Sequence, residues 1–195
     1  GGGGGVARLD TTAGEARLGA VRNGSYDGNM NGGDVSVSVG FGGTSGTAGA
    51  RSIGIVAQSI GMGGGILSTR GGMFDSLVLG GRYGVGHAGD VHVTLKTNSG
   101  SLTTQGEGSH GIVAQSIGGG GGLGGAISFE HGVNLVVFDV SASLEGGQLT
   151  AGDGGAVTVD VEDDLTTLGD GAYGVIAQSI GGGGGIGGSD PTQPV

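Results

Sequence analysis

Three stretches of the chain alternate apolar and polar residues with a period of two. They read DVSVSV at 34–39, DVHVTL at 90–95 and AVTVDV at 156–161, with Val or Leu at every second position. A period of two is typical of a β-strand that buries one face and exposes the other to water. These stretches therefore predict three strands, each of which opens a longer unit.

A second set of segments is almost identical in the three units. GIVAQSIGMGGG occupies 54–65, GIVAQSIGGGGG occupies 111–122 and GVIAQSIGGGGG occupies 174–185, which separates the three Gln residues by 57 and then 63 positions. Self-similarity at such a spacing is the signature of a repeat architecture. We expect one domain over 1–195 that is a fragment of a longer array, with copies at approximately 6–65, 66–122 and 123–188 and a tail at 189–195.

Short strands separated by Gly, Asn, Asp and Ser turns are compatible with a solenoid, a propeller blade or a sandwich. The variable unit length and the small or amide residues at the constant positions favour the solenoid. The sequence therefore predicts an all-β fold, a parallel β-helix (β-solenoid) built from about 60-residue repeats with Gly-rich turns. With coils of about 20 residues, each unit would hold two or three coils and the chain roughly ten.

The most constant polar residues are a Gln and the Ser that follows it. If several coils separate equivalent positions, Gln58, Gln115 and Gln178 cannot touch, so we expect them to cap the local backbone rather than to form a ladder. We also expect a structural role for the neighbouring Ser59, Ser116 and Ser179, because no His lies at a constant offset that would let it act as their base.

Composition narrows the classes of function. The 55 Gly residues among 195 exclude an ordinary helical domain, since Gly destabilises helix interiors. A net charge of −10 would repel nucleic acids and anionic membranes. The lack of Cys excludes disulfides and thiolate metal sites, and no apolar run approaches the ~18 residues of a bilayer span. The glycine runs 118–122 and 181–185 are compatible with tight corners, extended segments or mobile loops.

The acidic residues do not form a repeated metal site. Asp34 and Asp90 share a position in the repeat, but the third copy has Ala156 there. The densest acidic group is Asp160, Glu162, Asp163 and Asp164. The alternation with Val places Asp160 and Glu162 on the outer face, which favours a solvated surface over a calcium site.

The histidines have no zinc-site spacing. They are His87, His92, His110 and His131, and none recurs in the repeat. Because His110 aligns with Ile53 and Tyr173, we expect an exposed position that tolerates any side-chain shape. The sequence thus predicts no catalytic, cofactor-binding or metal-binding residue, no cofactor and no enzymatic activity.

The string GIVAQSIGGGGG, preceded by Thr-x-Gly, resembles the repeats in the passenger regions of large bacterial autotransporters, the type V secreted surface proteins. The resemblance implies a secreted β-helical passenger that is extracellular and attached to the outer membrane of a Gram-negative cell. It also implies a role in adhesion or biofilm formation, with surface glycans or proteins of host or neighbouring cells as partners.

Our leading expectation is therefore a structural or adhesive segment that serves as stalk or adhesin. One alternative is a self-associating extracellular fibre module, whose terminal coils pair through their open edges. The second is a carbohydrate-active β-helix enzyme, for which 3 Tyr, 4 Phe and no Trp provide little sugar-stacking surface.

Overall fold

The computed structural model describes residues 5–9, 15–18, 30–62, 64–70, 76–79, 86–96, 100–128, 141–144, 152–182 and 185–186. Within these ranges all regular secondary structure is β-strand, and the strands pair in parallel. The prediction of an all-β fold with stacked parallel strands is confirmed. No helix suited to crossing a bilayer occurs among these residues.

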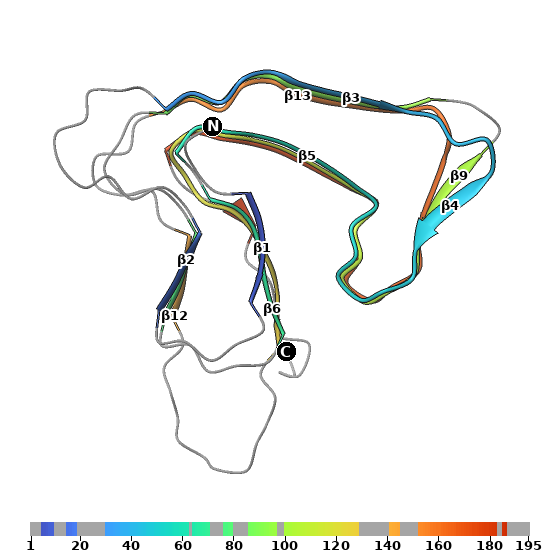
Figure 1. The fold of residues 1–195 in the computed structure, drawn as a ribbon, viewed down its shortest axis with the longest axis horizontal. Helices are drawn as coiled ribbons and strands as arrows, with labels where there is room; N and C mark the ends of the chain where they lie inside the picture. Colours follow the sequence, from blue (N-terminus) through green and yellow to red (C-terminus); the bar gives the residue numbers. More distant parts are fainter. Residues whose placement is uncertain are drawn as a thin grey trace, which may run out of the picture.

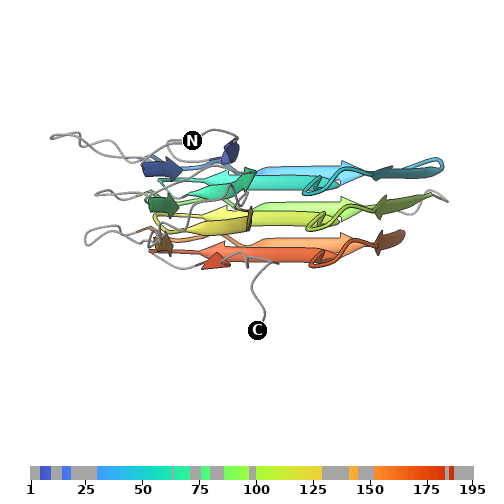
Figure 2. The same ribbon diagram turned by 90° about the horizontal axis from the view of Figure 1, so that it is seen from below.

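The described strands form five parallel sheets, and successive circuits of the chain lie on top of one another. Viewed down the stack, the circuits nearly superimpose (Figure 1), and from the side they form layers (Figure 2). The sheets contain β3 (Val35–Val39), β8 (Val91–Leu95) and β13 (Val157–Val161); β4 (Thr44–Thr47), β9 (Ser101–Thr104) and β14 (Asp164–Thr167); β5 (Ile55–Ile60), β10 (Ile112–Ile117) and β15 (Val175–Ile180); β2 (Glu15–Leu18), β7 (Ser76–Leu79) and β12 (Ser141–Leu144); and β1 (Gly5–Leu9), β6 (Gly65–Arg70), β11 (Gly122–Ser128) and β16 (Gly185–Ile186).

We call the circuits that contain β3–β5, β8–β10 and β13–β15 the first, second and third coil. Val35 pairs with Val91, 56 residues later, and Val91 pairs with Val157, 66 residues later. The expectation of two or three coils per unit is therefore wrong. One circuit passes through five sheets, which takes far more residues than a coil of about 20.

The main core lies between the β3–β8–β13 sheet and the β5–β10–β15 sheet, which face each other in Figure 1. The alternating Val and Leu residues of β8 are buried, whereas His92 between them is exposed. The three predicted strands are thus confirmed, and their predicted inward face is buried in β8, whereas it is only partly buried in β3 and β13 and Val161 is exposed. The core consists of Ile55, Ala57, Val91, Val93, Leu95, Leu102, Ile112 and Ala114, with Val35, Val37, Val39, Phe41, Val157, Val159 and Leu165 packed against it.

Glycine makes the corner between the β5–β10–β15 sheet and the β1–β6–β11–β16 sheet. Residues 118–122 are buried, and their backbone bonds to the coils on both sides, for example from Gly118 N to Ile180 O at 2.8 Å. Gly122 has a φ of +158°, and a Cβ there would lie 2.2 Å from the carbonyl oxygen of Gly65. The run 118–122 is therefore a tight corner, whereas Gly183 and Gly184 lie outside the described residues.

Candidate functional site

The repeated Gln residues form a ladder that runs through the three coils. Gln58 Nε2 donates to Gln115 Oε1 at 2.7 Å, and Gln115 Nε2 donates to Gln178 Oε1 at 2.5 Å. The side chain of Gln115 is fully buried. The expected local capping is wrong, because these residues are paired neighbours in adjacent strands rather than several coils apart.

Strand alternation places the ladder on one face of the β5–β10–β15 sheet. Ala57 and Ala114 point into the main core, so the Gln that follows each of them points away from it. On that same face Val113 and Ile176 pack against Ile66. A buried amide costs free energy unless both its donor and its acceptor are bonded, and the ladder supplies both partners for Gln115.

The repeated Ser residues connect the coils on the other side of the sheet. Ser59 Oγ donates to Gly33 O of its own coil at 2.8 Å and accepts from Gly89 N of the next coil at 2.9 Å. Ser116 does the same with Gly89 O at 2.8 Å and Gly155 N at 2.7 Å. These hydroxyl protons are donated to carbonyl oxygens, which suits a structural role better than a nucleophilic one.

The recurring aspartates also bond from coil to coil. Asp34 Oδ1 accepts from the backbone N–H of Asp90 at 2.9 Å, and Asp90 Oδ1 accepts from that of Ala156 at 2.8 Å. Each carboxylate thus accepts a hydrogen bond from a backbone N–H of the coil that follows it. Sequence reasoning missed this function, although the recurrence of Asp at one position of the repeat was its signal.

The acidic residues of the third coil lie mainly at the surface. Asp160 and Glu162 are exposed, as the alternation predicted. Asp163 is partly buried, and its carboxylate accepts from Gly100 N at 3.2 Å and from Asp164 N at 3.2 Å. Over the described ranges, no three His, Cys, Asp or Glu residues are grouped so that they could hold a metal ion.

His110 is buried, so the expectation of an exposed position is wrong. Only 8% of its surface is accessible, because Tyr173 of the third coil covers it with a ring-centroid distance of 5.5 Å. The backbone N–H of Tyr173 donates to His110 Nδ1 at 3.1 Å. Burial lowers the pKa of His110 below its ordinary value, because it disfavours the charged imidazolium.

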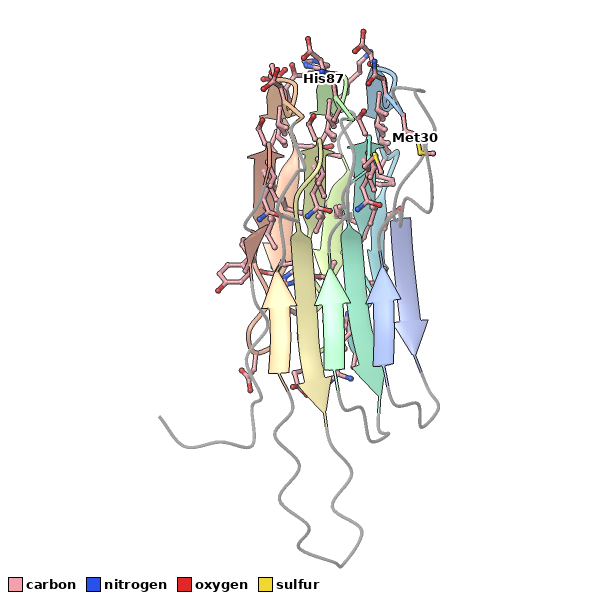
Figure 3. All side chains as sticks on the ribbon, turned by 90° about the vertical axis from the view of Figure 1, so that its left-hand side faces the viewer. Met30 and His87 are labelled. Atoms are coloured by element: carbon pink, nitrogen blue, oxygen red, sulfur yellow. The ribbon has the colours of Figure 1, made fainter. Side chains whose placement is uncertain are left out.

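Two other histidines of the second coil face carboxylates of the third. His87 Nδ1 lies 3.4 Å from Asp153 Oδ2, and His92 Nε2 lies 3.5 Å from Asp160 Oδ2. His87 is labelled in Figure 3, where the side chains of successive coils form rows across the stack. His131 lies outside the described residues.

The geometry defines a stack of parallel β-coils in which the repeated polar residues bond from one coil to the next. No protein family, curated protein or solved structure matches this chain.

Proposed function

We propose that the chain is a structural or adhesive segment of a bacterial autotransporter passenger, displayed at the cell surface or secreted, where it serves as stalk or adhesin. In this proposal the architecture is a parallel β-solenoid of about 60-residue repeats with Gly-rich corners. The GIVAQSIGGGGG strings, which resemble autotransporter passenger repeats, support the assignment.

The observation that carries the proposal is that the repeated Gln and Ser residues form hydrogen bonds from one coil to the next. Gln115 is fully buried and bonds to the coils on both sides, and Ser116 links the segments that precede β8 and β13 through Gly89 and Gly155. Repetition in this chain therefore serves stacking, which extends a rod without enlarging its core. A chain with no Cys that is held by packing and backbone pairing needs no disulfide formation during export.

Protease treatment of intact cells tests the location. Antibodies raised against the 195-residue chain follow its fate when cells of the source organism are treated with proteinase K, and a periplasmic protein serves as the protected control. The proposal predicts that the chain is degraded or shed while the control stays intact. Protection of the chain until the cells are lysed would contradict surface display.

Bead binding separates stalk from adhesin. The purified chain is coupled to beads, and the beads are tested on host-cell surfaces and on immobilised glycans against beads that carry a heat-unfolded sample. Binding by the folded chain alone identifies an adhesin. Equal, background-level binding by both samples identifies a stalk that presents another segment.

A further inference from the structure

His110 holds the third coil through a ring nitrogen that a proton would also bind. The backbone N–H of Tyr173 donates to His110 Nδ1 at 3.1 Å. A ring nitrogen accepts a hydrogen bond only while it carries no proton, so neutral His110 has its proton on Nε2. A proton added at Nδ1 would remove the acceptor and set one N–H against another. The contact between His110 and Tyr173 therefore requires a neutral imidazole.

The surroundings of His110 do not compensate a positive charge. The charged or titratable residues of the neighbouring segments 48–54, 105–111 and 168–174 are Arg51, Glu107, Asp170 and Tyr173. Glu107 and Asp170 are exposed, and no ion pair joins His110 to a carboxylate in the described structure. Arg51 is itself positive. The ring of Tyr173 attracts a cation, but it cannot replace the lost acceptor of the backbone N–H.

His87 makes the same kind of contact with a carboxylate beside it. Its Nδ1 accepts from the backbone N–H of Asp153 at 3.2 Å, and Asp153 Oδ2 lies 3.4 Å from the same nitrogen. A proton on this Nδ1 can be donated to the carboxylate, which keeps the second and third coils linked. Protonation thus breaks the link at His110 but exchanges one link for another at His87.

The first coil shows that an amide oxygen can replace the imidazole nitrogen. Asn31 lies 56 residues before His87, and its Oδ1 accepts from the backbone N–H of His87 at 3.0 Å. An amide oxygen accepts this bond without titrating. Ile53, which holds the position of His110 one coil earlier, has no side-chain acceptor. At this position the junction between the first and second coils therefore has no titratable contact.

We propose that His110 makes the contact between the second and third coils sensitive to acid. With a neutral imidazole the segment 168–174 is held against the second coil, and protonation of His110 at Nδ1 opens this segment while β14 and β15 stay paired on either side. Both coils lie within this chain, so the proposal does not depend on what precedes or follows it, or on surface display.

Backbone hydrogen bonds also hold this segment, so the opening is local. Leu168 N donates to Thr104 O at 2.8 Å, and Gly111 N donates to Tyr173 O at 2.9 Å. The bond to His110 lies next to the second of these. Its loss on protonation weakens the attachment at Tyr173, whereas the strand pairing of β14 with β9 and of β15 with β10 involves no titrating side chain.

The pH range of the opening follows from proton binding to the open segment. Opening exposes His110 to water, which returns its pKa to the ordinary value of about 6.5. In the closed state burial keeps the pKa of His110 below that value. The open population therefore rises as the pH falls below about 6.5, by up to about tenfold at about pH 5.5.

Hydrogen–deuterium exchange of backbone amides, corrected for the intrinsic pH dependence of exchange, tests the proposal at about pH 7.5 and about pH 5.5. In wild type the protection of 168–174 should fall by about three- to tenfold, whereas that of 48–54 should change less. His110→Asn keeps an acceptor that does not titrate, so 168–174 should be protected equally at both pH values. His110→Ile introduces the residue of the first coil, which has no acceptor, so protection should be low at both.

NMR of the imidazole nitrogens provides an independent measurement on wild type. At about pH 7.5 the proton of His110 should be on Nε2. Circular dichroism establishes that each variant is folded. A proton on Nδ1 at neutral pH, wild-type protection that does not change with pH, equal losses in 48–54 and 168–174, or an unchanged pH dependence in His110→Asn would each overturn the proposal.

Discussion

Replacing Gln115 with Leu removes the centre of the Gln ladder at nearly constant volume. The substitution removes two hydrogen bonds and leaves Gln58 Nε2 and Gln178 Oε1 without their partner. A hydrogen bond contributes about 0.5–1.5 kcal/mol net, and similar volume keeps the packing cost small. We expect Gln115→Leu to lower the free energy of unfolding by about 1–3 kcal/mol.

Urea unfolding followed by circular dichroism measures this loss. Gln58→Leu and Gln178→Leu are the matched controls, because each end residue makes only one ladder bond and is only partly buried. Each should cost about half as much as the central substitution. If Gln115→Leu is no more destabilising than either control, or is more stable than wild type, the ladder does not hold the coils together.

Three further substitutions probe other contacts between or within the coils. Gly106→Ala would place a Cβ 2.2 Å from Gly49 O, so it should lower the unfolding free energy by about 1–3 kcal/mol in urea titrations, while Gly42→Ala, whose Cβ meets nothing, should not. Arg51 has a φ of +56° and its counterparts are Gly, so Arg51→Gly should raise the melting temperature, equivalent to a gain of up to about 1 kcal/mol. Burial lowers the pKa of His110, so as the pH falls the unfolded chain takes up the proton before the folded chain does, and stability decreases below about pH 6.5. His110→Phe should therefore reduce the difference in melting temperature between neutral and mildly acidic buffer.

The strands that open each coil could be predicted from the sequence because their pattern is local. Alternating Val residues identify the buried face of β3, β8 and β13 without knowledge of what covers it. The role of the Gln residues is different, because it depends on which strands are neighbours. Spacings of 57 and 63 residues fit one large coil or several small ones equally well, and only one large coil brings the Gln side chains into contact.

The burial of His110 could not be predicted for a related reason. Ile53, His110 and Tyr173 share one position of the repeat, yet Tyr173 is 57% exposed and His110 is buried. Exposure at this position is set by the coil that lies above it, not by the local sequence. The inter-coil bonds of Asp34 and Asp90 also required the register, although their recurrence marked the position.

Disulfide trapping tests most directly whether each repeat is a single coil stacked on the next. The chain has no Cys, so a pair can be introduced without interference. Ser38 pairs with Thr94 in neighbouring strands, about 4.8 Å apart, within disulfide range, whereas Ser38 and Asp160 are separated by two strand spacings. We predict that Ser38→Cys/Thr94→Cys forms an intramolecular disulfide in dilute solution, identified by peptide mapping, and that Ser38→Cys/Asp160→Cys does not. Failure of the first pair to form, or equal formation by both, would contradict the stacked arrangement.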